Sequence, residues 1–166
     1  MSNKRNITVV TGIRSEYGIW KPVLARIAAS RRLNLQVVVT GVHLLREFGQ
    51  TAKQVHADGW PTVMDVPMYR GGEPIAASVA RGVAGMARAF EKLRSDVVMV
   101  LGDRFEIFAA AGAALTQQRV IAHVHGGEVA PAQFDEQIRH AVTKLAHLHF
   151  CSTKLARRRI VQMGEN

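Results

Sequence analysis

The sequence has a single cysteine, Cys151, and no long apolar run among its 166 residues. One cysteine cannot form a disulfide within the chain, which favours a reducing compartment and leads us to expect a cytoplasmic protein. The longest apolar stretches, such as residues 35–40, are far shorter than the ~20 residues of a membrane-spanning helix. The opening MSNKRNITVV also lacks the apolar core of a secretory signal. We therefore expect no contact with a membrane.

Acidic and aromatic residues are scarce as well. Lysine and arginine number 22 against 13 aspartates and glutamates, for a net charge of +9, and aromatic residues make up 6% of the chain. The basic excess would suit nucleic acid, an anionic small ligand such as a phosphate ester, or an acidic partner domain or subunit. Nucleic acid is the least favoured, because the basic residues are scattered and not interleaved with aromatic ones. We expect no nucleic-acid partner.

The remaining composition is that of a globular protein, with 48% hydrophobic and 21% charged residues. The length predicts one domain over residues 1–166 with a substantial core. Short β-rich runs alternate with helical patterns. The predicted strands are 7–11, 35–40, 62–66, 97–101, 120–124 and 148–151. The predicted helices are 17–30, 44–58, 74–93, 105–118, 137–145 and 154–163. This alternation predicts an α/β fold with a Rossmann-like, doubly wound parallel sheet.

Residues 123–150 form the segment richest in titratable groups. It follows the apolar strand 120–124, and ligands of open α/β sheets bind beyond the carboxyl ends of strands. His123 and His125 alternate along that strand, so both rings would lie on one face and could form a metal pair. No further cysteine, histidine or carboxylate completes a recognised zinc spacing. Structural histidines are therefore favoured, and we expect no metal.

Acidic residues follow the same strand. A Gly-Gly turn lets Glu128 reach over the cleft, where a buried acid could transfer protons, although an exposed loop glutamate is the simpler interpretation. On the helix that follows, Asp135 and Arg139 lie four residues apart, as do Glu136 and His140, so both pairs could simply stabilise the helix. Three acids within nine positions after a strand are nevertheless harder to explain by structure alone than any one of them.

Two other strand ends carry candidate residues. In TGIRSEYG, a glycine turn precedes a helix, and Arg14 could grip a phosphate; the alternative is a plain turn with Glu16 favoured by the helix dipole. The segment is not the G-x-G-x-x-G fingerprint, so we infer no nicotinamide cofactor. In LGDRFE, Asp103 either points into the cleft or caps the helix that begins near Phe105, and the cap is slightly favoured for the segment alone.

Taken together, these motifs resemble the hydrolysing UDP-N-acetylglucosamine 2-epimerases, in particular the branch of sialic and legionaminic acid biosynthesis. The matching segments are TGIRSEYG, GDRFE and HVHGGEVAPAQFDEQIRHAVTKLAHLHF, and their order and spacing agree over nearly the whole chain. The resemblance implies a GT-B-type enzyme of two Rossmann-like domains, of which this chain is the N-terminal one. It also implies cleavage of a UDP-linked N-acetyl sugar with inversion at C2, by elimination of UDP and addition of water, without a redox cofactor or an obligatory metal.

The resemblance further implies roles for single residues. Asp103, Glu128 and Asp135 would be the carboxylates at the sugar, with Glu136 a near alternative to Asp135. The implied substrate-binding residues are Arg14 at the diphosphate, and Arg139, His140 and His125 along the cleft. The family usually has glycine where this chain has Ala132.

In the family, the second domain supplies most of the nucleotide contacts and a further histidine. We therefore expect the 166-residue chain alone to be inactive, and the full-length form to be a homo-oligomer. Two other functions stay open: a domain of a GT-B glycosyltransferase, and a non-catalytic module for sugar-nucleotide binding or assembly.

Overall fold

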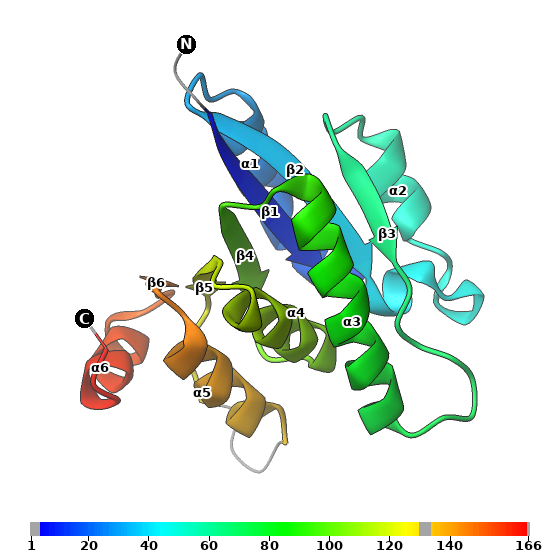
Figure 1. Ribbon diagram of the computed structural model, residues 1–166. Coiled ribbons are helices and arrows are strands. Elements are labelled where there is room, and N and C mark those ends of the chain that lie inside the picture. Colours follow the sequence, from blue (N-terminus) through cyan, green and yellow to red (C-terminus); the bar gives the residue numbers. More distant parts are fainter. Residues whose placement is uncertain (1–3, 130–133, 166) are drawn as a thin grey trace.

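The computed structural model describes residues 4–129 and 134–165, and it contains a parallel sheet of six strands in the order β3-β2-β1-β4-β5-β6 (Figure 1). The strands are β1 (Arg5–Thr11), β2 (Leu33–Thr40), β3 (Val63–Val66), β4 (Val97–Leu101), β5 (Val120–Val124) and β6 (Leu148–Phe150). All neighbouring pairs run parallel. Each predicted strand is confirmed, with its ends within two residues of the prediction.

Helices alternate with the strands, as the sequence pattern predicted. They are α1 (Arg14–Ala28), α2 (Ala52–Ala57), α3 (Ile75–Leu93), α4 (Phe105–Thr116), α5 (Asp135–Leu145) and α6 (Lys154–Gln162). The prediction of one helix over 44–58 is wrong: that stretch holds parts of two short 3₁₀ turns, η1 (Gly41–Leu44) and η2 (Arg46–Phe48), and then α2. Gly49 and Gln50 both have positive φ, at 79° and 46°, and this left-handed backbone ends the helical path.

The sheet is covered on both faces, which confirms the doubly wound fold. Successive residues of β1 point to opposite sides: Val9 packs in a cluster with α1 and α2, and Val10 packs in a cluster with α3, α4 and α5. Figure 1 shows α3 and α4 in front of the sheet and α1 behind it. Within the described ranges, no helix is long and apolar enough to cross a membrane.

The chain order reverses between β1 and β4. From β1 the chain builds outward through β2 to β3, and from β4 it builds the other way through β5 to β6. At such a switch point the loops after the two central strands diverge and leave a crevice at their carboxyl ends. The loops after β1, β4 and β5 therefore meet where ligands of this architecture bind.

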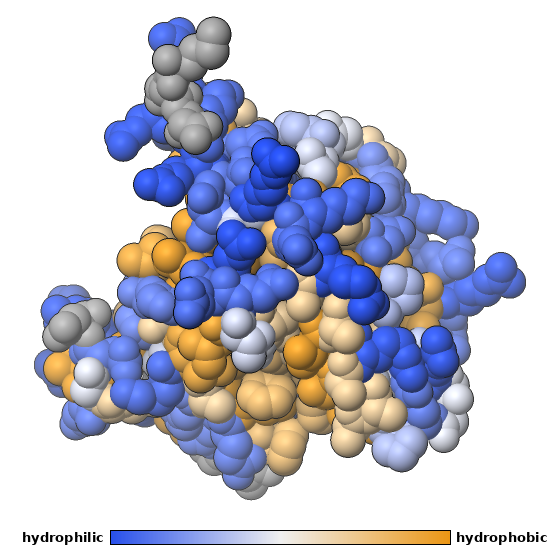
Figure 2. Space-filling view, viewed as in Figure 1, coloured by the Kyte–Doolittle hydropathy of each residue, from blue (hydrophilic) through white to orange (hydrophobic). Residues whose placement is uncertain are grey.

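A depression lies on the face of the sheet that α3, α4 and α5 cover. Apolar side chains gather over α3, α4 and α5 in the lower part of Figure 2. They line a groove of about 770 Å³, which we call the α3–α5 groove. Its lining residues are Ile75, Ala76, Val79, Ala80, Phe105, Phe108, Phe134, Gln137, Ile138 and Ala141.

Candidate functional site

A polar cleft of about 220 Å³ opens at the switch point, between the loops after β1, β4 and β5 and helix α5. We call it the switch-point cleft. It is lined by Ile13, Ser15, Glu16, Ile19, Leu101, Gly102, Asp103, Arg104, His125, Glu128 and Arg139. Four of the predicted catalytic or substrate-binding residues are among them: Asp103, His125, Glu128 and Arg139.

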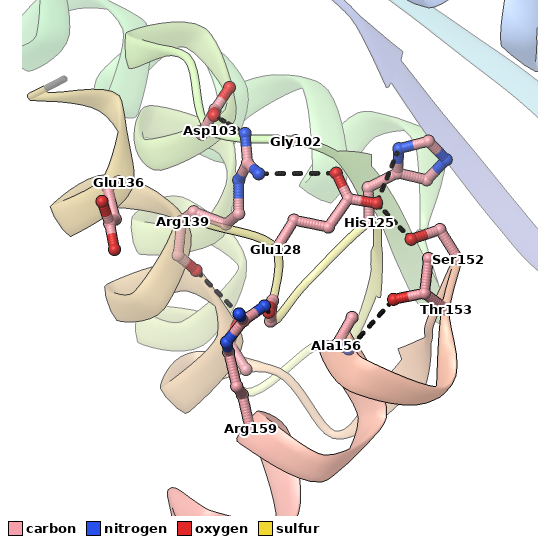
Figure 3. A network of polar contacts seen from close by, with 12 residues as sticks. Gly102, Asp103, His125, Glu128, Glu136, Arg139, Ser152, Thr153, Ala156 and Arg159 are labelled. Carbon is pink, nitrogen blue, oxygen red and sulfur yellow. Dashed lines mark hydrogen bonds and ion pairs between the residues drawn. The ribbon is translucent and has the colours of Figure 1, made fainter. Parts of the chain in front are cut away.

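Arg139 joins two carboxylates from neighbouring strand ends (Figure 3). Its guanidinium donates to Asp103, which follows β4, and lies 3.5 Å from Oε2 of Glu128, which follows β5. The arginine side chain is only 12% exposed, and burial lowers its pKa. Arginine stays protonated in proteins, so two acids share one cation in the cleft.

Glu128 has further contacts on its other oxygen. Ser152, just after β6, donates its hydroxyl hydrogen to Oε1, and Nδ1 of His125 lies 3.7 Å from the same oxygen. The carboxylate is therefore held from both sides, by α5 and by the segment after β6. Sequence reasoning missed Ser152, because nothing in the local pattern ties it to a residue 24 positions earlier.

Only His123 of the two histidines belongs to β5, so the strand alternation assumed for the pair ends before His125. His125 lies beyond the strand end with φ of 62°, which turns it toward Glu128. His123 is fully buried, with Nε2 2.8 Å from the Gly102 carbonyl oxygen and Nδ1 3.2 Å from Oγ1 of Thr143. Burial lowers the pKa of His123 to about 4, so the ring is neutral near pH 7. The structural interpretation of His123 is confirmed.

The slight preference for Asp103 as a helix cap is also wrong. Helix α4 begins at Phe105, and its N-cap residue is Arg104, with no side-chain cap bond. Asp103 lies one residue too early to cap, and it bonds to Arg139 across the cleft. The Asp103 carboxylate is therefore oriented by Arg139 on α5 and not by the start of α4.

The candidates at the start of α5 lie beside the cleft rather than in its lining. The expected helical pair of Asp135 with Arg139 does not form, because Arg139 turns to Asp103 and Glu128. The other expected pair is confirmed, with His140 Nε2 3.5 Å from Glu136 Oε1. Figure 3 draws Glu136 apart from the network around Arg139.

Arg14 is the exposed first residue of α1, and it too is absent from the cleft lining. The roles of Arg14, Asp135, Glu136 and His140 therefore stay predictions. Ala132 lies outside the described residues. Within residues 4–129 and 134–165, no group of three or more histidine, cysteine, aspartate or glutamate side chains is arranged to hold a metal ion.

The cleft lining includes a buried acid, Glu16, whose place in the first turn of α1 could also be explained by the helix dipole. Glu16 is 6% exposed, and its Oε2 accepts a hydrogen bond of 2.9 Å from the Gly12 amide. Burial raises the pKa of the Glu16 carboxyl to about 7; the Gly12 amide opposes the rise and Glu106 adds to it. Glu106 is fully buried in the first turn of α4, 3.2 Å from Arg104. The sequence held one signal for Glu106, because it is the only charged residue in the helix segment FEIFAAAGAALT.

Comparison with known proteins finds relatives that cover nearly the whole chain. The family model described as UDP-N-acetylglucosamine 2-epimerase matches residues 25–166. The chain is 37% identical over 164 residues to the UDP-N,N'-diacetylbacillosamine 2-epimerase (hydrolyzing) of Legionella pneumophila, covering 97% of this chain and 43% of that protein. It is 34% identical over 161 residues to the UDP-N-acetylglucosamine 2-epimerase of Neisseria meningitidis, covering 97% of this chain and 42% of that protein.

Solved structures show the same fold. The UDP-GlcNAc 2-epimerase from Neisseria meningitidis, bound to UDP-GlcNAc, superposes with a TM-score of 0.86 at 19% identity, over 97% of this chain and 43% of that one. A further UDP-N-acetylglucosamine 2-epimerase superposes with a TM-score of 0.85 at 20% identity, over 99% of this chain and 46% of that one. The chain thus spans less than half the length of these relatives, and its sheet corresponds to the N-terminal half of a GT-B-type architecture.

Proposed function

Because the chain belongs to the UDP-N-acetylglucosamine 2-epimerase family, we propose that it forms the N-terminal half of a hydrolysing 2-epimerase that acts on a UDP-linked N-acetyl sugar. The observation that carries the proposal is the bridge of Arg139 between Asp103 and Glu128 at the switch point. A second, C-terminal domain would supply the facing wall and most of the nucleotide contacts. A cytoplasmic location belongs to the same proposal.

The proposed reaction has two steps. A base removes the proton from C2 of the sugar while the bond from C1 to the UDP oxygen breaks, which leaves a glycal and UDP. Water then adds its hydroxyl to C1, and a proton returns to C2 on the opposite face. C1 of the sugar develops positive charge as UDP leaves, and carboxylates fixed nearby stabilise that charge.

Asp103 and Glu128 suit these tasks. Asp103 follows β4 and Glu128 follows β5, and both carboxylates contact the single guanidinium of Arg139, which fixes their positions. Such fixed groups need no rearrangement as charge develops. Asp135, or its neighbour Glu136, is proposed as a further acid at the sugar, and Arg14 at the diphosphate. His125 and His140 are proposed to line the substrate path. No cofactor or metal is required by these steps.

The substrate is tested by direct incubation. The protein expressed from its complete reading frame would be given UDP-N-acetylglucosamine and UDP-N,N'-diacetylbacillosamine separately, because the relatives are named for both sugars. We expect release of UDP and of a free manno-configured sugar from one of them. In deuterated water the product should carry deuterium at C2. Release of UDP without deuterium at C2 would contradict proton abstraction.

Two variants test the assigned residues. Asp103→Asn and Glu128→Gln keep the side-chain shapes but remove the charges, so each should lower turnover by roughly a hundredfold or more. Asp65→Asn is the matched control, because Asp65 is an exposed partner of His56 outside the cleft. The 166-residue chain alone should show no turnover, and substantial turnover by it would overturn the proposal of an incomplete site.

A further inference from the structure

The backbone that leads into Glu128 rests directly on helix α6. Gly127 has φ of 73°, and a Cβ atom there would lie 2.4 Å from the carbonyl oxygen of Ala156. The Gly127 carbonyl oxygen in turn accepts a hydrogen bond of 3.3 Å from Arg159. Only glycine fits this close approach, so the turn before Glu128 is fixed against α6.

The Glu128 side chain meets the same part of the chain. Ser152 donates to Oε1, while Arg139 on α5 lies 3.5 Å from Oε2 (Figure 3). The next residue, Thr153, caps α6 by accepting a hydrogen bond of 3.0 Å from the Ala156 amide. The cap sets the backbone at the start of α6 and thereby the place of the serine hydroxyl.

Each oxygen of the carboxylate is therefore held by a donor from a different element. Arg139 supplies a full positive charge, whereas Ser152 supplies a neutral hydroxyl that orients Glu128 without cancelling a second unit of charge. Two donors on separate oxygens, approaching from different sides, restrict the side-chain torsions of Glu128 from χ1 to the carboxylate. Because Glu128 lines the switch-point cleft, these contacts fix how its carboxylate is presented there.

We propose that Ser152 is a positioning residue for Glu128, and that the segment from β6 to α6 serves the cleft by holding this acid in place. The catalytic consequence rests on the proposed function above, but the positioning itself does not. A hydroxyl at position 152 is the requirement, so threonine should replace serine and alanine should not. Ser152 is exposed, which leaves room for the extra methyl group of threonine.

The first experiment compares turnover in the protein expressed from its complete reading frame. Ser152→Ala should lower kcat roughly tenfold, the loss expected for one hydrogen bond to a charged group, with KM unchanged. Ser152→Thr should restore kcat to near the wild-type value. Ser30→Ala is the matched control, because the Ser30 hydroxyl oxygen accepts one exposed hydrogen bond from the Arg32 amide, outside the cleft. An unchanged kcat in Ser152→Ala would overturn the proposal.

The melting temperature separates positioning from a merely structural role. Thr153→Ala removes the cap of α6 and should lower the melting temperature of the 166-residue chain. Ser152→Ala should leave it unchanged, because within residues 4–129 and 134–165 that hydroxyl bonds to the Glu128 carboxylate and not to the cap of α6. A fall as large as that of Thr153→Ala would overturn the positioning role.

A third measurement needs no enzymatic activity. In the 166-residue chain, the NMR couplings between Hα and Hβ of Glu128 should report one rotamer in the wild type and averaged rotamers in Ser152→Ala. Averaged couplings in the variant would support the positioning role even where the complete protein fails to turn over either sugar nucleotide, so the two proposals fail separately. Identical couplings in both proteins would overturn it.

Discussion

Helix α5 separates two depressions of opposite character. Arg139 faces the switch-point cleft of about 220 Å³, and the preceding Ile138 lines the α3–α5 groove of about 770 Å³. The groove is larger, yet glutamine is its most polar lining residue. The cleft is smaller and gathers acids, arginines and a histidine from four parts of the chain. If the proposed function is right, size and apolar lining do not mark the chemical site in this fold, whereas opposed charges at the strand ends do.

Removing the cation from the cleft should have the largest effect. Arg139→Met leaves Asp103 and Glu128 facing one another without their shared guanidinium, so their repulsion displaces both. We expect turnover by the protein from the complete reading frame to fall by roughly a hundredfold to a thousandfold. Steady-state kinetics measure it. Lys144→Met, on the exposed side of the same helix, is the control and should retain activity.

The second-largest effect is expected from the packing of Gly127, the residue before Glu128, against helix α6. Gly127→Ala combines a positive φ with a contact of 2.4 Å to the Ala156 oxygen, and should destabilise the chain by roughly 3–5 kcal/mol. Urea denaturation of the 166-residue chain measures it. Gly18→Ala is the opposite case, because Gly18 lies inside α1 with nothing within 4 Å of an added Cβ. That substitution should stabilise by about 1 kcal/mol, and a loss of equal size in both variants would contradict the packing argument.

The buried acid of the cleft predicts a pH dependence of stability. The pKa of Glu16 rises from 4.5 to about 7 on folding, chiefly through burial. Between these values the folded chain binds the proton more tightly than the unfolded chain, so the free energy of unfolding should fall as the pH rises through this window. The fall has an upper value of about 3 kcal/mol.

Glu16→Gln tests this dependence. Glutamine keeps an oxygen for the Gly12 amide but cannot ionise, so the variant should lose the Glu16 contribution and gain stability relative to the wild type as the pH rises. Urea denaturation across the pH window measures both proteins. A constant difference between them at every pH would contradict a raised pKa for Glu16.

The fold was predictable because its strands are short apolar runs bounded by polar turns, and the parallel order followed from their alternation with helices. The failure at 44–58 has a local cause: Gly49 and the following Gln50 adopt left-handed backbone, and the helical periodicity around them hides that break. Periodicity describes which residues are apolar. It does not show where the backbone leaves the helical region.

The site was predictable only in part. The sequence placed Asp103 and Glu128 at neighbouring strand ends, because parallel strands share one carboxyl edge. It offered Arg139 a partner four residues away, whereas the structure gives it Asp103, 36 positions distant. Helical spacing identifies local partners alone, so contacts between elements, such as Ser152 with Glu128, need the fold. His125 departs from the predicted strand alternation because β5 ends at Val124 and the His125 backbone has a positive φ.

The smallest expected effect concerns the groove. We expect the 166-residue chain to self-associate weakly and reversibly through the α3–α5 groove, because apolar surface of this kind favours association while the net charge of +9 opposes it. Sedimentation should therefore show more association at high salt, where repulsion is screened. Ala80→Glu places a charge in the groove and should abolish this association. Ala77→Glu is the matched control, an exposed position on the same helix outside the groove. A wild-type chain that stays monomeric at every salt concentration would contradict a role of the groove in self-association.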